Sequence, residues 1–317
     1  MDLARILLMD SARIQMQDAE YSNQIREQRN QMLLEPIYTE DDVMEALRLF
    51  KIVEYNEEYE LTPRVTVRLT DAGHVIGSAA VHLTILEEGQ FKQVTFSGDV
   101  GRYGDMILKS PQSFPQADYI IIESTYGDSL HKDIEPIEDM LREVIQQTCM
   151  VKGGKVIIPA FSVGRSQELL FALNALELRG LLPEVCYYVD SPLSEKATQV
   201  LKNHPEQYNG QVKEIMKVDH DPFGFKGLKF IESVEESRAL NDDPRPAVII
   251  SSSGMAEAGR VKHHIRNNIG NEKHTILMVG YCEPRSLGGR LMAGAPVVGI
   301  FGDDYVVKAE VRSIKSM

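Results

Sequence analysis

The chain of 317 residues is poor in cysteine, and Cys149, Cys186 and Cys282 lie far apart in the sequence. The absence of a C-x-x-C pair argues against a thiolate zinc site and favours a reducing compartment, so we expect each cysteine to pack in a core. No segment approaches the roughly 18 apolar residues that span a bilayer. The first ten residues carry a charge every few positions and no small-residue cleavage site, unlike a signal peptide. We therefore expect a cytoplasmic protein that makes no membrane contact.

Positive charge is also scarce, because 34 Lys and Arg residues face 47 Asp and Glu residues, a formal net charge of −13. Such a molecule repels a polyanion at long range, so any nucleic-acid binding must use a local basic groove. With 43% hydrophobic residues, the chain is long enough for two domains with full cores.

The first part of the sequence predicts two helices followed by β structure. An amphipathic pattern covers residues 2–34, and Thr39 followed by Asp42 is a capping signal for a helix over about 40–50. From 64 to 123, apolar runs alternate with turns that contain Gly or Pro.

Three of these apolar runs, 65–69, 91–97 and 118–122, each end in small residues and one polar group. The polar groups are His74, Asp99 and Glu123. Small residues let the backbone turn sharply and leave the polar side chain exposed at one rim of the sheet. Zinc accepts an imidazole and carboxylates, but three such groups are too few for a bridged two-metal site and marginal for one zinc. Taken singly, Asp99 also fits a turn aspartate and Glu123 a helix cap.

After residue 127 the pattern changes to strands joined by helices. Strands are expected near 155–159, 185–189, 228–231, 247–251 and 275–279, with helices near 134–148, 164–179, 233–240 and 257–268. This alternation implies a mainly parallel sheet with helices on both faces. We place a domain boundary near 128 and expect residues after about 305 to return to the first domain's sheet.

Two loops of the second region combine small residues with the start of a helix. Ala160–Gly164 lies between a strand and the helix expected over about 164–179, with Arg165 beside it, and Ser251–Gly254 precedes a helix that carries Arg260. Backbone N–H groups at a helix N-terminus can meet an anion, so both loops suit a phosphate backbone. In the alternative interpretation the serines are simple N-caps and the basic residues form a solvated face. The candidate phosphate-binding residues are Ser162, Gly164, Arg165, Ser251, Ser252, Ser253, Gly254 and Arg260.

The spacing Ala160-x-Ser162-x-Gly164 also allows a different hypothesis, the nucleophile elbow of a serine hydrolase. That chemistry needs an acid and a histidine later in the chain. The available candidates stand in no distinctive loop; they are Asp190 or Asp219 with His263, His264 or His274.

With these residues in view, an ordered series of motifs resembles the β-CASP branch of the metallo-β-lactamase superfamily. That branch contains RNA-processing nucleases such as ribonuclease J and the nuclease subunit of the pre-mRNA cleavage and polyadenylation machinery. The motifs run through nearly all of the chain, and together they are highly specific. They are Asp10–Gln15 (DSARIQ), Asp71–Ala79 (DAGHVIGSA), Ser97–Gly101 (SGDVG), Glu123–Gly127 (ESTYG), Pro159–Glu168 (PAFSVGRSQE), Val189–Leu193 (VDSPL), Ser251–Met255 (SSSGM) and Gly280–Gly288 (GYxxxxSLG).

The resemblance implies an α/β fold made of two parts. Residues 1–128 would form a partial αββα metallo-β-lactamase sandwich. Residues 129–305 would form an inserted β-CASP domain with a mainly parallel sheet flanked by helices. Residues 306–317 would start the return to the metallo-β-lactamase domain.

The resemblance also implies a two-zinc nuclease site. His74 and Asp99 would be zinc ligands, with Asp99 the catalytic carboxylate that bridges two zincs. Glu123 would be the second catalytic residue, the acid that supports the active-site histidines. The implied reaction is hydrolysis of single-stranded RNA held in the cleft between the domains, by in-line attack of a metal-bound water at phosphorus.

The sequence also departs from the family pattern. The family's His-x-His-x-Asp-His signature, expected before Asp2, occurs nowhere in the sequence, and no histidine follows His274. We therefore expect an internal piece of a longer protein, with little catalysis and weak zinc occupancy by itself. The alternatives are a catalytically silent RNA-binding or scaffold protein of the same fold, and the serine hydrolase that would use Ser162. A truncated sandwich exposes sheet edges and apolar faces, which is compatible with a homodimer.

Overall fold

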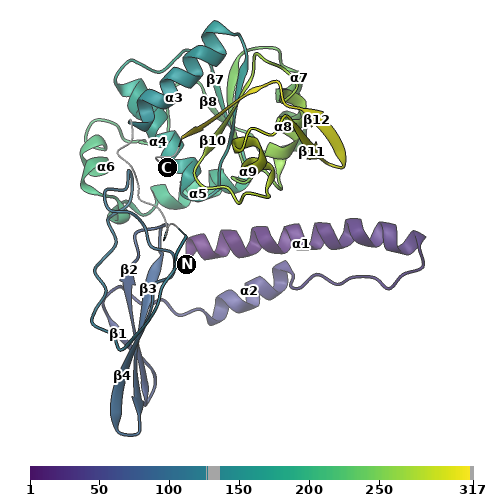
Figure 1. The fold of residues 1–317 in the computed structure, drawn as a ribbon. Helices are drawn as coiled ribbons and strands as arrows, with labels where there is room; N and C mark the ends of the chain where they lie inside the picture. Colours follow the sequence, from purple (N-terminus) through teal and green to yellow (C-terminus); the bar gives the residue numbers. More distant parts are fainter. Residues whose placement is uncertain (126, 128–135, 315–317) are drawn as a thin grey trace. The chain divides into compact units, whose positions relative to one another are not determined.

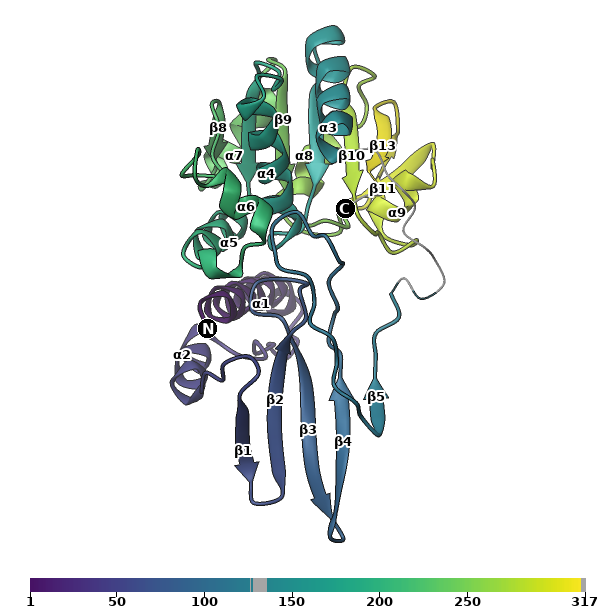
Figure 2. The same cartoon turned by 90° about the vertical axis from the view of Figure 1, so that its left-hand side faces the viewer.

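The computed structural model describes residues 1–125, 127 and 136–314, and the chain divides into two compact units. The first unit covers Met1–Glu123 and the second begins at Ser124 (Figures 1 and 2). The predicted boundary near 128 lies outside the described residues. Among those residues, no helix has the length and apolar character needed to cross a membrane.

The first unit contains two helices and one sheet. Its elements are α1 (Asp2–Gln28), α2 (Glu40–Leu49), β1 (Glu58–Thr62), β2 (Val65–Asp71), β3 (Ala79–Glu87), β4 (Gln90–Phe96) and β5 (Tyr119–Ile121). The strands lie in the order β1-β2-β3-β4-β5; neighbours are antiparallel except for β4 and β5, which are parallel. β2, β4 and β5 therefore run in the same direction, and their C-terminal ends lie at the same end of the sheet. The predicted ligands His74, Asp99 and Glu123 come directly after these strand ends.

The two helices form where local signals predict them. Thr39 and Asp42 make a capping box, because the Asp42 backbone N–H donates to Thr39 Oγ1 and the Thr39 N–H donates to Asp42 Oδ2. The first helix ends at Gln28, six residues before the predicted end. Asn30 has φ = +50°, a left-handed conformation that cannot continue a helix.

The second unit is built on a parallel sheet of six strands in the order β13-β10-β6-β9-β7-β8. Its strands are β6 (Lys155–Pro159), β7 (Cys186–Asp190), β8 (Leu228–Phe230), β9 (Ala247–Ser251), β10 (Thr275–Val279) and β13 (Glu310–Ile314). The hairpin of β11 (Val297–Ile300) and β12 (Asp303–Val306) is separate from this sheet. All residues of β6, β9 and β10 are buried, as expected for central strands covered on both faces.

Helices on both sides of the sheet provide that cover (Figure 1). They are α3 (Ile137–Ile145, which continues as a π-helix over Gln146–Val151), α4 (Arg165–Leu178), α5 (Pro192–Lys202), α6 (Gly210–Ile215), α7 (Val234–Asp242), α8 (Arg260–Asn268) and α9 (Leu287–Met292), with a 3₁₀ turn at Pro205–Gln207. Val261 and Ile265 of α8 share one core cluster with Ile157, Ile249 and Ile276 of the central strands. The predicted mainly parallel sheet flanked by helices is therefore confirmed.

One element lies elsewhere than predicted. Residues after 305 were expected to return to the first unit's sheet, but β13 pairs with β10 in parallel, from Thr275↔Glu310 to Val279↔Ile314. The expectation is wrong for residues 310–314. β10 offers a free edge to the returning chain, and pairing there satisfies the backbone groups of both strands.

Stability of the second unit should depend on pH through His274. Its Nδ1 accepts the Lys155 backbone N–H at 2.8 Å, and burial, with the nearby Lys155 charge, lowers the pKa of His274 from 6.5 to about 4. The His274 ring therefore binds a proton more readily in the unfolded chain than in the folded one. The neutral ring's contribution to the stability of the folded state is complete above about pH 6.5 and is lost as the pH falls toward 4. We expect the free energy of unfolding to fall by about 1–2 kcal/mol between pH 7 and 4.5, since partial exposure weakens the full effect.

Chemical denaturation of wild type and His274→Asn at both pH values tests this dependence. His274→Asn should show a smaller loss on acidification, whereas the exposed His220→Asn should match wild type. An unchanged pH dependence in His274→Asn would contradict the assignment.

Candidate active site and nucleic-acid interface

The loop between β2 and β3 presents His74 and is fixed by its own hydrogen bonds. The Ser78 hydroxyl accepts the backbone N–H groups of His74 and Val75 at 3.0 and 3.3 Å. Gly73 turns the chain with φ = +64°, and a Cβ there would lie 2.7 Å from the Pro111 nitrogen. Only glycine meets both conditions, so the small residues around His74 give it a defined backbone position.

A second loop, which carries Asp99, packs directly against the first. A Cβ on Gly101 would lie 1.8 Å from the Gly73 carbonyl oxygen, and the Gly101 N–H donates to the Ala72 carbonyl at 2.8 Å. This contact places His74 Nε2 3.9 Å from Asp99 Oδ2, with side chains that are 47% and 75% exposed. The distance is too long for a hydrogen bond, so both groups remain open to a shared ligand.

Glu123 supports the Asp99 loop from the end of β5. Its Oε1 accepts the Val100 backbone N–H at 2.8 Å, and its own backbone N–H donates to Ser97 Oγ at 3.1 Å. The half-buried carboxylate is therefore bound to the residue next to Asp99. This arrangement suits a positioning group.

The fit of these residues to a metal is partial. Within 1–125, 127 and 136–314, no three His, Cys, Asp or Glu side chains come close enough together to hold one ion. His74 and Asp99 offer two donors, whereas a catalytic zinc takes about three protein ligands and a structural zinc about four. The pair therefore does not form a complete zinc site by itself.

In the second unit, hydroxyl groups join the loops that follow β6, β7 and β9. Ser191 Oγ lies 3.2 Å from Ser162 Oγ and 2.7 Å from Ser252 Oγ. A Cβ on Gly254 would lie 2.7 Å from a ring carbon of Phe161, so these loops are also in close contact. Because the carboxyl ends of parallel strands meet at one edge, the predicted loop residues Ser162, Ser252 and Gly254 come together.

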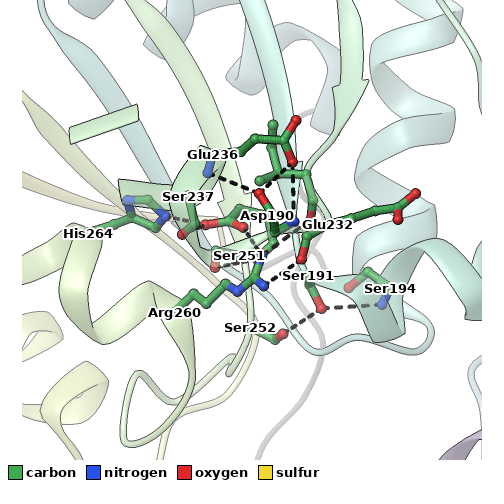
Figure 3. A network of polar contacts seen from close by, with 12 residues as sticks. Asp190, Ser191, Ser194, Glu232, Glu236, Ser237, Ser251, Ser252, Arg260 and His264 are labelled. Atoms are coloured by element: carbon green, nitrogen blue, oxygen red, sulfur yellow. Dashed lines mark hydrogen bonds and ion pairs between the residues drawn. The ribbon is translucent and has the colours of Figure 1, made fainter. Parts of the chain in front are cut away.

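Asp190, the last residue of β7, is fully buried, and its carboxylate is the centre of the network in Figure 3. Oδ1 accepts a hydrogen bond from Arg260 Nη1 at 2.7 Å. Oδ2 lies 2.6 Å from His264 Nε2 and accepts the Ser237 hydroxyl. The Ser251 hydroxyl donates to the Asp190 carbonyl oxygen at 2.8 Å.

Burial by itself raises the pKa of Asp190, but hydrogen bonds from His264, Ser237 and Arg260 outweigh it, and the net pKa is lowered. The carboxylate is therefore ionised at neutral pH, and donors from α7 and α8 compensate its charge.

This network gives two predicted phosphate contacts a different role. The Arg260 guanidinium also donates to the carbonyl oxygens of Ile231 and Glu232, at 3.3 and 2.7 Å, so its donors point into the fold. Ser251 is 1% exposed and bonded to β7. We therefore remove Arg260 and Ser251 from the candidate phosphate-binding residues. The guanidinium of Arg260 donates to the buried Asp190 carboxylate and to backbone carbonyls, and the Ser251 hydroxyl donates to the Asp190 carbonyl.

The remaining predicted residues lie at the loop surface or the start of α4. Arg165 forms an ion pair with Glu168 and keeps 21% of its side chain exposed. Gly164 caps α4 with φ = +79° and provides no side chain that could cover the helix N-terminus. Ser253 Oγ donates to the Ala258 carbonyl at 3.3 Å and stays on the loop before α8.

The arrangement does not support a serine hydrolase. Ser162 Oγ is hydrogen-bonded to Ser191 Oγ, and the described residues show no bond from it to a histidine. His264, which lies nearest to an acid, is fully buried, with one ring nitrogen on Asp190 and the other on Asn241. Neither nitrogen is available to accept a proton from a nucleophile.

Sequence reasoning missed the structural pairing of Asp190 with His264, Arg260 and Ser237. A usable signal existed, since Asp190 ends an apolar strand and His264 falls on the apolar face of its helix beside Val261 and Ile265. A charged group at such a position needs a partner.

Comparison with known proteins finds a β-CASP family model and relatives that include ribonucleases. A family model described as the Beta-Casp domain matches residues 166–291. The chain is 32% identical over 280 residues to a protein named a ribonuclease from Thermus thermophilus, covering 88% of this chain and 63% of that protein. It is 31% identical over 292 residues to an RNase J-like protein of Methanocaldococcus jannaschii, covering 90% and 66%.

A third relative, the transcription termination factor FttA of Methanosarcina mazei, is 31% identical over 268 residues, covering 82% of this chain and 41% of that protein. The chain thus spans less than two thirds of the length of each of these three relatives.

Replacement of Arg260 by alanine should destabilise the second unit, because the buried Asp190 carboxylate loses a charged donor. We expect the free energy of unfolding to fall by about 2–4 kcal/mol, measured by urea denaturation. Arg266→Ala is the matched control on the same helix and should cost less than about 1 kcal/mol, since within the described residues Arg266 forms no ion pair. Equal stability of the two variants would show that the network contributes nothing.

Proposed function

Because the chain belongs to the β-CASP family of the metallo-β-lactamase superfamily, we propose that it serves in zinc-dependent hydrolysis of RNA phosphodiester bonds, in RNA processing or decay. The observation that supports this proposal is the pair of exposed side chains His74 and Asp99, held 3.9 Å apart by contact between their loops. An imidazole and a carboxylate at this separation are suited to one cation.

We assign His74 and Asp99 as zinc ligands and Glu123 as a positioning residue. Glu123 acts through the backbone, since its carboxylate holds the N–H of Val100 and so orients the neighbouring Asp99. Two donors are an incomplete ligand set, so this chain by itself should bind zinc weakly and cleave RNA slowly.

The substrate we propose is single-stranded RNA. Ser162, Gly164, Ser252, Ser253 and Gly254 would meet its phosphates, with Arg165 beside them. The support is the meeting of the loops after β6 and β9, next to the N-terminus of the fourteen-residue helix α4. Hydroxyl and backbone N–H donors bind phosphate oxygens without reading the base.

A second candidate function is a catalytically silent RNA-binding or scaffold protein. It is favoured by the same incomplete ligand set, since RNA contact needs no metal. The two candidates differ in whether cleavage appears when zinc is abundant.

The zinc proposal is tested by metal analysis and by cleavage of end-labelled single-stranded RNA. After dialysis we expect less than one zinc per chain. With excess zinc we expect slow cleavage that falls by about 100-fold or more in Asp99→Asn, because the carboxylate is a direct ligand. His74→Ala should lose zinc affinity, while the exposed His220→Ala should not.

Three outcomes would change the assignment. Two tightly bound zincs per chain would show that ligands other than His74 and Asp99 complete the site. Cleavage undiminished in Asp99→Asn would overturn the proposed role of these residues. Retained RNA binding without cleavage at saturating zinc would favour the silent protein.

The phosphate contact proposed for Arg165 gives a separate prediction. Arg165→Ala should weaken binding of U-rich, A-rich and mixed RNA oligonucleotides by a similar factor, and should lower the slope of log K against log salt by about 0.7. Glu168→Gln removes the ion-pair partner and should bind RNA at least as well as wild type. Unchanged affinity in Arg165→Ala, measured by fluorescence anisotropy, would remove Arg165 from the interface.

A further inference from the structure

An exposed aromatic residue stands at the tip of the β11–β12 hairpin of the second unit. Phe301 and Gly302 form the two-residue turn between the paired Ile300 and Asp303, with φ of +54° and +92°. Phe301 is 47% exposed. Two positive φ values are typical of a type I′ hairpin turn, in which Asn or Gly is the usual first residue.

Phenylalanine is an unfavourable choice at this position. A bulky side chain at positive φ costs about 1–2 kcal/mol relative to glycine, and burial of the ring in a core does not offset this cost, because the ring is half exposed. A residue kept in a strained backbone conformation at the surface points to a use for its side chain.

Three side chains, all from α8, contact this ring. Lys262 Nζ lies 5.0 Å and Arg266 Cζ 5.6 Å from the centre of the Phe301 ring. The His263 ring lies 4.5 Å from it, tilted by 33°. Burial and the nearby Arg266 charge lower the pKa of His263, so its ring stays neutral and adds a second flat surface.

The charge of Lys262 and Arg266 is not compensated. Within the described residues neither forms an ion pair with a carboxylate, although the chain carries a net charge of −13. By contrast, Arg260 and Arg165 are both paired to acids. In the part of the chain that the structure describes, Lys262 donates only to the Glu257 backbone carbonyl and Arg266 to the Asn267 side-chain oxygen, so beside the half-exposed ring the charge is positive, opposite to that of the whole chain.

We propose that Phe301, Lys262 and Arg266 form a contact site for single-stranded RNA, with a base stacked on Phe301 and neighbouring phosphates bound by the two cations. The proposal uses the proposed function only in taking RNA as the ligand, and it concerns residues outside the candidate active site. Aromatic rings accept any base, and lysine and arginine accept phosphate, so this contact should be independent of sequence.

The site is small. Asp303 and Asp304 follow on β12 and limit the negative charge that can approach, so we expect a contact with one base and about two phosphates. An acidic peptide fits less well, because it offers charge to Lys262 and Arg266 but no planar group to Phe301.

The test is binding of a labelled twelve-nucleotide single-stranded RNA, measured by fluorescence anisotropy in EDTA so that no cleavage occurs. Phe301→Asn supplies the residue that the turn prefers and removes the ring. It should weaken binding by about fivefold or more, the loss expected for one base–aromatic stack. Phe301→Tyr keeps a stacking ring and should bind within about twofold of wild type.

The cations are tested in the same assay. Lys262→Ala combined with Arg266→Ala should lower the slope of log K against log salt by about 1.4, while Lys213→Ala on α6, at the other side of the unit in Figures 1 and 2, should leave it unchanged. Thermal unfolding of each variant checks that the fold is retained, and the Tyr and Lys/Arg variants remain informative if Phe301→Asn is unstable.

Wild-type RNA affinity in Phe301→Asn, or in the Lys262 and Arg266 double variant, would overturn the proposal. Competition by polyglutamate as effective as that by RNA, and insensitive to Phe301, would indicate an acidic protein partner instead. If these variants bind normally while Arg165→Ala binds weakly, only this site fails. If wild type binds no RNA, both this site and the proposed function fail.

Discussion

A carboxylate placed in a protein interior loses its hydration, and charged or polar donors must replace the water. Asp190, at the end of β7, is such a carboxylate. The guanidinium of Arg260, the imidazole of His264 and the hydroxyl of Ser237 take the place of its hydration water. These donors come from α7 and α8, so both helices are held at the carboxyl edge of the sheet. The Ser251 hydroxyl, at the end of β9, donates to the Asp190 carbonyl and so ties β9 to the end of β7. The loops that follow these strands are thereby brought close enough for their serine hydroxyls to meet.

This constraint also divides the basic residues of α8 by helical position. Arg260 and His264 are four residues apart and face the buried carboxylate, whereas Lys262 and Arg266, also four apart, lie beside the Phe301 ring. One short helix therefore uses one pair of side chains for its own fold and presents the other pair outward. In an acidic chain, a basic residue such as Arg260, whose donors are directed to a buried carboxylate and to backbone carbonyls, is not evidence for polyanion binding.

Much of the fold could be predicted from local and periodic features of the sequence. The Thr39–Asp42 capping box needs only neighbouring residues, and the parallel sheet follows from strands that alternate with helices. The direction of Arg260 could not be predicted, because it depends on a partner seventy residues earlier, Asp190. Nor could the pairing of Glu310–Ile314 with β10, since the sequence of an edge strand does not specify which free edge it joins. Both predictions therefore failed where a contact between residues far apart in the sequence decided the outcome.

The pair His74 and Asp99 illustrates why a partial ligand set can still be well ordered. Their separation is set by contact between two backbones, with Gly101 lying against Gly73 where no Cβ fits, rather than by an attraction between the two side chains. Such a pair is preorganised whether or not a metal is present, because the glycine contact and the Ser78 hydrogen bonds are independent of it. A missing ligand should then lower metal affinity while the geometry of the two loops stays the same. Metal affinity and cleavage, rather than the arrangement of these loops, are what separate an active nuclease from a silent RNA-binding relative with the same fold.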